Sequence, residues 1–224
     1  MLLRPLWRRL LQARFRLFQS HRYDRLILET ISGKPFLVLP QVFNPALFAT
    51  SRLFAEALDA RLIPPGSTVL DMGTGSGIAA IFAAQWAERV VAVDINPFAV
   101  RCARINALLN CVEDRVEVLQ GDLFAPVQGR RFDVALFNPP FYRGAPRDDL
   151  DAAWRSIDAL DRFAAGLRDH LAPGGWALVI LSSNGETESF LRAFRAGDFA
   201  VETVAERDVI SERLLIYRFT STSE

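Results

Sequence analysis

Apolar runs alternate with amphipathic segments along most of the chain. From Ser67 onward, short runs rich in Val, Leu and Ala are separated by stretches in which apolar residues recur at helical spacing. The runs predict strands, and most of the longer stretches between them predict helices. The expected strands are 68–72, 89–94, 116–120, 132–137, 176–181, 199–206 and 213–219, and the expected helices are 78–86, 97–109, 151–171 and 186–196.

This alternation predicts an α/β domain with a mostly parallel sheet and helices on both faces, because parallel strands need a crossover connection. No helical pattern separates the last two strands, so one of them is expected to run antiparallel. Ligands of such sheets bind beyond the carboxyl ends of the strands. Residues that directly follow a strand are therefore the first candidates for function.

The first 66 residues follow a different pattern. Apolar residues and arginines are arranged over residues 2–18 as in an amphipathic helix. A short apolar run at 36–39 is typical of a strand or hairpin arm, and Pro45 is expected to open a helix that reaches about Leu58. We therefore expect an N-terminal part over residues 1–40 and a main domain over residues 41–224.

Composition excludes several classes of protein. The chain has 224 residues, of which half are hydrophobic, and it contains two cysteines and two histidines. These numbers exclude a disulfide scaffold and oppose a zinc site of ordinary ligand spacing. No uncharged apolar run approaches the roughly 20 residues that span a bilayer, and no clean secretory segment is visible. The expectation is a cytoplasmic protein without a metal.

The net charge is zero, but the charges are unevenly distributed. Residues 1–25 hold seven arginines and one acidic residue, whereas residues 26–224 hold 19 basic and 25 acidic residues and carry a net charge of −6. The basic segment favours a helix that caps the main domain with its arginines in water. Contact with RNA or the ribosome is the alternative, and binding to a membrane surface is the weakest one.

The first motif, Asp-Met-Gly-Thr-Gly-Ser-Gly at 71–77, follows the strand 68–72. Its glycines permit a sharp turn, and the backbone N–H groups at the start of the next helix suit a carboxylate or phosphate. The motif departs from the dinucleotide-binding fingerprint, because Ile78 occupies a position where that fingerprint requires glycine. The carboxylate of Asp71 can bind the ammonium group of an amino-acid-like ligand.

Acidic residues follow the next two strands. Asp94 ends the strand 89–94 and can accept both hydroxyl groups of a ribose, although it can also cap the helix 97–109. Asp122 follows the strand 116–120 and can accept a proton from an adenine amino group, with Leu123 or Phe124 against the ring. The alternative for Asp122 is an ordinary turn residue.

The most specific motif is Asn138-Pro139-Pro140-Phe141, directly after the strand 132–137. Two prolines stiffen the loop, so the amide oxygen of Asn138 and the carbonyl oxygen of Pro139 can act as fixed acceptors for a planar amino group. Phe141 offers a flat face on which a substrate can stack. Tyr142 and Arg143 are candidates for substrate contact, although a solvated loop residue is the preferred interpretation of Arg143.

In this order, the four motifs resemble the class I S-adenosylmethionine-dependent methyltransferases, and most closely the "methyltransferase small" group, whose loop reads Asn-Pro-Pro-Tyr or Asn-Pro-Pro-Phe. The resemblance covers residues 40–185 and includes the segments 42–44, 50–53 and 171–175. It implies a Rossmann-like seven-stranded sheet with an antiparallel last strand, and S-adenosylmethionine as the cofactor. The implied cofactor-binding residues are Asp71, Gly73, Thr74, Gly75, Gly77, Asp94, Ile95, Asp122, Leu123 and Asn138, and the implied catalytic residues are Asn138, Pro139, Pro140 and Phe141.

The resemblance implies an N-methyltransferase that acts on a planar amino or amide nitrogen. Phe141, with a glycine nearby, is more like the ribosomal-RNA guanine-N2 enzymes, whereas the segment 71–80 is more like the release-factor glutamine enzymes of the HemK type. We prefer an RNA base amino group slightly, with protein glutamine as the alternative acceptor. A nucleotide-dependent oxidoreductase and a non-catalytic binding module are remote alternatives, because Ile78 opposes the first and the intact Asn138 opposes the second.

Overall fold

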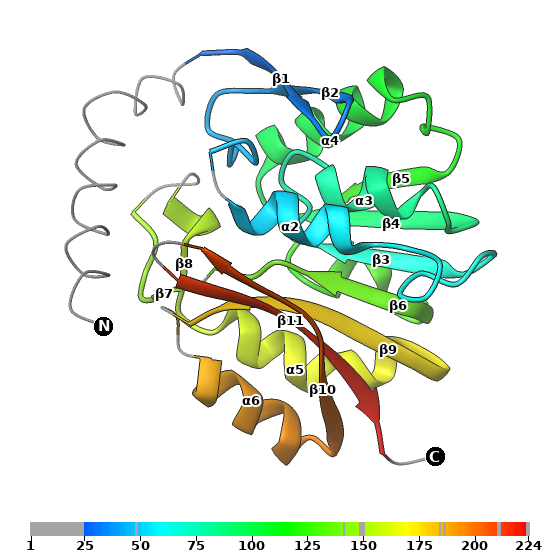
Figure 1. Ribbon diagram of the computed structural model, residues 1–224, viewed down its shortest axis with the longest axis vertical. Helices are drawn as coiled ribbons and strands as arrows, with labels where there is room; N and C mark the ends of the chain where they lie inside the picture. Colours follow the sequence, from blue (N-terminus) through cyan, green and yellow to red (C-terminus); the bar gives the residue numbers. More distant parts are fainter. Residues whose placement is uncertain are drawn as a thin grey trace.

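A computed structural model describes residues 25–47, 49–140, 142–147, 151–183, 185, 187–209 and 212–222. The helix expected at 2–18 and the side chain of Phe141 lie outside these residues. The centre of the fold is a seven-stranded sheet with the order β10-β11-β9-β6-β3-β4-β5 (Figure 1). Its strands are β3 (Thr68–Met72), β4 (Arg89–Asp94), β5 (Val116–Gln120), β6 (Phe132–Phe137), β9 (Leu171–Ser182), β10 (Phe199–Val209) and β11 (Glu212–Ser221).

The directions of the strands confirm the expected fold class. The pairs β3–β4, β3–β6, β4–β5 and β6–β9 are parallel. β11 lies between β9 and β10 and is antiparallel to both. The last strand is therefore the antiparallel one, as the missing crossover helix predicts.

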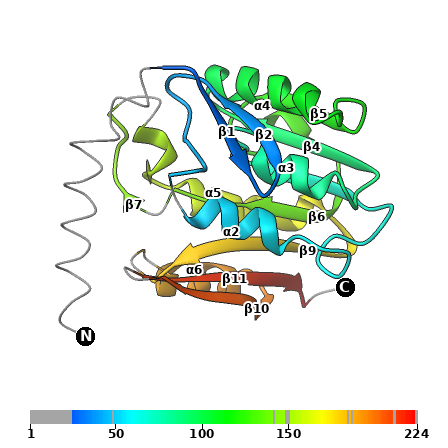
Figure 2. The same ribbon diagram turned by 45° about the horizontal axis from the view of Figure 1, so that its top comes forward.

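Helices cover both faces of the sheet (Figures 1 and 2). One buried cluster joins Phe54 and Ile81 to Val69 of β3, and the cluster on the opposite face joins Phe163 to Leu70 of the same strand. Alternate residues of a strand thus fill two cores, as the two-residue period of a strand requires. The first face carries α2 (Ala49–Ala57), α3 (Ile78–Ala83) and α4 (Pro97–Leu109), and the second carries α5 (Ala159–His170) and α6 (Thr187–Ala196).

A two-stranded hairpin, β1 (Ile27–Ile31) and β2 (Lys34–Val38), packs against α4. Asn106 of α4 is completely buried and binds Leu37 twice: its Oδ1 accepts from the backbone N–H at 2.7 Å, and its Nδ2 donates to the backbone carbonyl at 2.8 Å. The same Nδ2 donates to the carbonyl of Ser76 at 2.9 Å. One amide therefore fixes the hairpin, α4 and the glycine loop together. The sequence predicted β2 but not β1.

The helix expected at 151–171 is wrong in its first third. Residues 151–153 form a 3-10 turn, η3 (Asp151–Ala153), which is followed by β8 (Arg155–Ser156). β8 pairs in parallel with the two-residue strand β7 (Tyr142–Arg143). α5 begins at Ala159, whose backbone N–H donates to the hydroxyl of Ser156 at 3.0 Å. Pairing with a distant segment overrides the helical pattern.

Other element boundaries shift by a few residues. α2 begins at Ala49 rather than at Pro45, and α3 ends at Ala83 rather than at Trp86. β9 begins at Leu171 rather than at residue 176, and its register with β6 is interrupted between Phe132 and Val134. The domain boundary expected at residue 40 stays a prediction.

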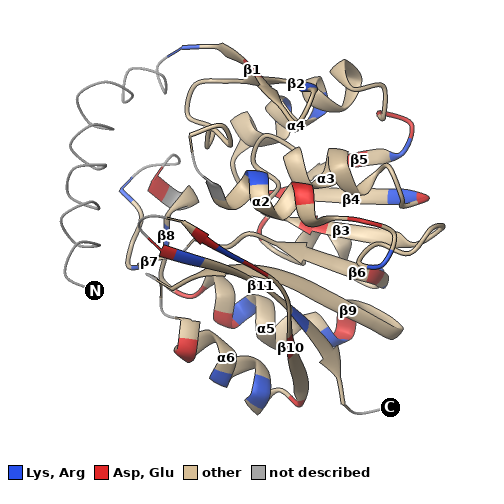
Figure 3. Ribbon diagram, in the orientation of Figure 1, with Lys and Arg blue, Asp and Glu red and all other residues tan. Residues whose placement is uncertain are grey.

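Acidic and basic residues are interspersed over the described part of the chain (Figure 3). Ion pairs join facing strands, as between Arg213 and Glu206 at 2.9 Å and between Arg218 and Glu202. Within the described ranges, no helix combines the length and apolar character needed to cross a membrane.

Candidate active site

The four motifs lie at one edge of the sheet. Met72 at the end of β3 is in register with Val93 of β4 and with Phe137 of β6, and Asp94 is in register with Gln120 of β5. The loops that follow these parallel strands therefore emerge side by side at their carboxyl ends. This is the edge at which open α/β sheets bind ligands.

The glycine loop between β3 and α3 requires glycine at its end. Gly77 has a φ of +84°, in the left-handed region that other residues rarely adopt. A Cβ atom at Gly77 would also lie 3.1 Å from Ala103 of α4. The loop thus needs glycine both for its backbone conformation and for the close contact of two helices. Gly73 and Gly75 have positive φ angles as well.

Asp71 is buried beside this loop, with 3% of its surface exposed. Its Oδ2 accepts from Thr74 Oγ1 at 2.6 Å and from the backbone N–H of Ala80 at 3.1 Å. Burial raises the pKa of Asp71 to about 7, against the lowering effect of these two hydrogen bonds. None of the described residues donates to Oδ1. One carboxylate oxygen is therefore left for a cationic ligand group.

Asp94 connects the glycine loop to the loop after β4. Its Oδ2 accepts from the N–H of Gly75 at 2.8 Å, and its Oδ1 accepts from the N–H of Asn96 at 2.9 Å. Burial raises the pKa of Asp94 above its usual value. The helix cap alternative is wrong for Asp94, because Asn96 caps α4 by accepting from the N–H of Phe98 at 2.8 Å. Each Asp94 oxygen keeps acceptor capacity for a ligand hydroxyl, and the adjacent Ile95 side chain is exposed.

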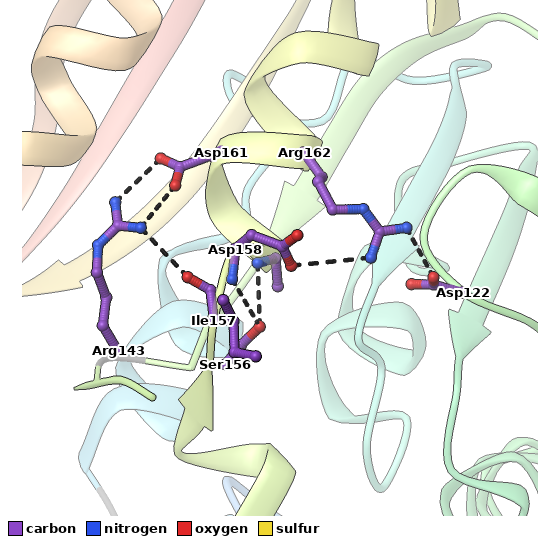
Figure 4. Close-up of polar contacts among 8 residues, drawn as sticks. Asp122, Arg143, Ser156, Ile157, Asp158, Asp161 and Arg162 are labelled. Atoms are coloured by element: carbon purple, nitrogen blue, oxygen red, sulfur yellow. Dashed lines mark hydrogen bonds and ion pairs between the residues drawn. The ribbon is translucent and has the colours of Figure 1, made fainter. Parts of the chain in front are cut away.

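Asp122 lies in a tight turn and is paired with a distant helix. A Cβ at Gly121 would lie 2.8 Å from the ring of Pro126, so only glycine fits there. Asp122 Oδ2 binds Arg162 Nη2 of α5 at 2.6 Å, and both side chains are about half exposed (Figure 4). Leu123 follows with a φ of +48°. Asp122 is therefore more than an unpaired turn residue, and its contact with adenine stays a prediction.

Arg143 is held by the start of α5 (Figure 4). Its Nη1 and Nη2 bind the two oxygens of Asp161 at 2.6 and 3.0 Å, and Nη1 also donates to the carbonyl of Ile157 at 3.3 Å. The guanidinium lies over the ring of Phe190, 5.5 Å from its centroid. This bidentate pair fixes β7 to α5 and gives Arg143 a structural role. A substrate contact of Arg143 or of the exposed Tyr142 stays a prediction.

Asn138 follows β6 and is half-buried. Its Nδ2 donates to Oγ of Ser51 at 3.1 Å, and Ser51 is a buried residue of α2. In the described residues, Asn138 Oδ1 has no hydrogen-bond donor. The amide oxygen is therefore available as an acceptor, while the amide nitrogen is bound to the protein. Pro139 is buried and Pro140 is half-buried behind it.

Ser51 and Arg162 were not among the residues predicted from the sequence. Two signals pointed to Ser51: it lies in the segment 50–53 that resembles the family, and it is a serine on the apolar face of the helix expected at 45–58, where a buried hydroxyl needs a partner. Arg162 gives no signal, since an arginine on an amphipathic helix is ordinarily a solvated residue.

Comparison with known proteins places these motifs in a family. The family model for the methyltransferase small domain matches residues 35–208. A Methanocaldococcus jannaschii protein, provisionally named protein N5-glutamine methyltransferase, is 33% identical over 201 residues, covering 85% of this chain and 97% of the relative. A release factor glutamine methyltransferase from Koribacter versatilis is 34% identical over 191 residues, covering 72% of this chain and 67% of that relative.

A solved structure agrees in fold. The T. thermophilus 16S rRNA N2 G1207 methyltransferase, in complex with AdoMet and guanosine, superimposes with a TM-score of 0.63 at 25% identity. The alignment covers 88% of this chain and 50% of that one. The family match spans most of the chain and contains all four motifs. The chain therefore belongs to the methyltransferase small domain family.

Proposed function

We propose that this protein transfers a methyl group from S-adenosylmethionine to the side-chain amide nitrogen of a glutamine in another protein. The observation that carries the choice of acceptor is the 33% identity to the M. jannaschii protein N5-glutamine methyltransferase over 97% of that relative. The Koribacter release factor enzyme supports the same acceptor. A translation release factor is accordingly the first protein to test.

The residues at the sheet edge fit the groups of S-adenosylmethionine. The available Oδ1 of Asp71 suits its ammonium group, and the glycine loop at the start of α3 suits its carboxylate. Asp94 suits the ribose hydroxyls, and the exposed Ile95 offers an apolar face to the adenine. When bound, S-adenosylmethionine supplies an electrophilic methyl group on a positively charged sulfur.

The loop after β6 fits an amide acceptor. An amide nitrogen is a poor nucleophile, because its lone pair is delocalised into the carbonyl group. In the proposal, Oδ1 of Asn138 and the carbonyl oxygen of Pro139 each accept a hydrogen bond from one of the two N–H groups of this nitrogen. These two hydrogen bonds favour the pyramidal nitrogen of the transition state. With the cofactor bound, the nitrogen lone pair would take the methyl group, the sulfur would keep the electrons of the C–S bond, and one N–H proton would pass to water.

The charge of the chain beyond its basic first 25 residues also supports a protein acceptor. Residues 26–224 carry a net charge of −6, whereas RNA binding depends on basic side chains that replace phosphate counterions. The Arg143 guanidinium near the site is bound to Asp161. Because of Phe141, the sequence slightly favours an RNA base amino group. This acceptor becomes the second candidate. It is favoured by the basic segment 1–25 and by the likeness to the N2 G1207 enzyme.

Methyl transfer from tritiated S-adenosylmethionine tests the proposal. A purified release factor and ribosomal RNA are offered in parallel, with Asn138→Ala as the control of strongly reduced activity. We expect label in the protein, and mass spectrometry should place one methyl group on a glutamine side chain. Label confined to the RNA overturns the glutamine assignment in favour of a base amino group. A protein that binds S-adenosylmethionine but labels neither acceptor overturns both candidates.

A further inference from the structure

We propose that Ser51 is a positioning residue for Asn138, which holds the amide so that its carbonyl oxygen faces the acceptor nitrogen. The inference rests on the proposed function, because that function gives the amide oxygen its role. It concerns a residue of α2, in a part of the chain that contains none of the four motifs.

The contact joins two polar side chains that depend on each other. Ser51 is 4% exposed, and its Oγ lies 3.1 Å from Nδ2 of Asn138, a residue 87 positions away. In the part of the chain that the structure describes, neither side chain has another hydrogen-bond partner. A buried hydroxyl without a partner is unfavourable, so removing either residue leaves the other one with an unsatisfied polar group.

In the structure, this contact leaves the oxygen end of the amide for the acceptor. A serine hydroxyl can donate as well as accept, so Ser51 fixes the position of the amide group, and the N–H groups of the acceptor select its orientation. The oxygen and nitrogen of an asparagine amide have nearly the same shape, so a half-turn about the last side-chain bond exchanges an acceptor for a donor. With Nδ2 bound to Ser51, Oδ1 of Asn138 points away from α2. The exchanged orientation would present N–H groups to the N–H groups of the acceptor, which cannot hydrogen-bond.

α2 provides a rigid support for Ser51. Phe54 and Ala55, three and four residues further along, lie on the same helical face and are buried in the core against α3. Arg52 and Glu56 lie on the exposed side and form an ion pair at 3.0 Å. The Ser51 hydroxyl is therefore fixed by core packing and not by the stiffness of the Asn138 loop.

Three substitutions test the role of Ser51 in turnover. Ser51→Ala removes the hydroxyl, and Ser51→Cys keeps the volume but accepts hydrogen bonds poorly. We expect each to lower kcat about tenfold, the usual effect of one lost hydrogen bond, with KM for S-adenosylmethionine unchanged. Ser51→Thr keeps a hydroxyl and should retain kcat within about threefold. Ser67→Ala is the matched control, because Ser67 is a buried serine at the opposite end of β3.

A double-mutant cycle separates positioning from general stability. In the Asn138→Ala background, Ser51→Ala should change the residual rate by less than about twofold, because the group it positions is gone. Fully additive losses would show that Ser51 acts independently of Asn138, and they would overturn the proposal. So would wild-type kcat in both Ser51→Ala and Ser51→Cys.

The side-chain amide resonances of Asn138 in NMR spectra give a readout that needs no turnover. They are identified as the pair missing from Asn138→Ala. We expect Ser51→Ala and Ser51→Cys to shift this pair and to speed its hydrogen exchange, and Ser67→Ala to leave it unchanged. An unshifted pair in both Ser51 variants overturns the contact. If the wild type methylates neither acceptor, the proposed function fails, and these resonances still decide whether Ser51 holds the amide.

Discussion

The two halves of the candidate site are built in different ways. The cofactor half, formed by the loops after β3, β4 and β5, is joined mainly by contacts within and between the motifs themselves, as between Asp71 and Thr74 and between Gly75 and Asp94. The acceptor half, formed by the loop after β6, is joined by long-range contacts, as between Asn138 and Ser51. Local motifs thus shape the cofactor half, and packing of separate elements shapes the acceptor half.

The electrostatics of the two halves differ in the same sense. Asp71 and Asp94 are carboxyl groups whose pKa values are raised by burial. The charges of the acceptor half are partly exposed pairs, such as Arg143 with Asp161. Changes in the cofactor half should therefore act on binding and its pH dependence, whereas changes near Asn138 should act on the rate.

Asn138→Ala should have the largest effect. Loss of one preorganised acceptor lowers the rate by about 10²–10³-fold. The affinity for S-adenosylmethionine should stay within about threefold, because at most one weak hydrogen bond to the cofactor is at stake. Single-turnover methyl transfer and calorimetry measure the two quantities. A variant that keeps its rate but loses the cofactor would move Asn138 into the cofactor half.

Asp94→Ala should lower the affinity for S-adenosylmethionine by about 10- to 100-fold, the effect of losing hydrogen bonds to a charged group. It also removes the acceptor of the Gly75 and Asn96 N–H groups, so its melting temperature must be followed as well. The matched control is Asp114→Ala, at an exposed acidic residue between α4 and β5. Unchanged affinity in a folded Asp94→Ala protein would exclude Asp94 from the ribose site.

Asp71 should make cofactor binding depend on pH. Its pKa of about 7 means that it is mostly protonated at pH 6 and mostly ionised at pH 8. Since an ammonium group binds the ionised form, and since the α-amino group of the ligand itself loses its proton near pH 8, the affinity should rise about fourfold between these pH values. Asp71→Asn should remove that rise. Calorimetry of both proteins at both pH values decides it, and parallel pH curves would show that Asp71 does not meet the ammonium group.

The same group should affect the stability of the ligand-free protein in the opposite direction. The pKa of Asp71 in the folded chain lies above the ordinary value of 3.8 for an aspartic acid, so the folded state binds the proton more tightly. The free energy of unfolding should therefore fall as pH rises from about 4 to about 7. Denaturant titrations should show a flatter pH curve for Asp71→Asn. An equally steep curve in this variant would assign the pH dependence to other groups.

The smallest effects are expected at the ion pair between Asp122 and Arg162. Arg162→Gln should lower cofactor affinity by less than about threefold, because a half-exposed pair contributes little. Asp122→Ala should lower it by about three- to tenfold, if the carboxylate accepts from the adenine. Equal losses in the two variants would mean that the pair only holds the loop after β5.

The elements of the cofactor half could be read from the sequence with most of their boundaries. β3, β4, β5 and α4 occupy the predicted residues, whereas α3 ends three residues before the predicted Trp86. Buried parallel strands appear as apolar runs, and Asn96 followed by Pro97 marks the start of α4. These signals depend on neighbouring residues, so they do not change with the elements that pack around them.

The segment between β6 and α5 could not be read in this way. Residues 151–158 have an amphipathic pattern, but the backbone N–H of Tyr142 donates to the carbonyl of Trp154 at 3.0 Å and draws this segment into an extended pairing. The ring of Trp154 also packs edge-on against Phe43, at 5.4 Å between centroids. A periodicity within one segment carries no information on which distant segment will compete for its backbone.

The sequence by itself determined the α/β class, the order of the motifs and the type of chemistry, because glycine turns, strand-end acids and the Asn-Pro-Pro loop depend on neighbouring residues. Only the tertiary structure decided that Ser51 holds the Asn138 amide, that Arg162 pairs with Asp122 and that Arg143 is bound to Asp161. Those contacts depend on where α2 and α5 pack on the sheet. That packing is set by apolar burial over the whole chain, which no single motif contains.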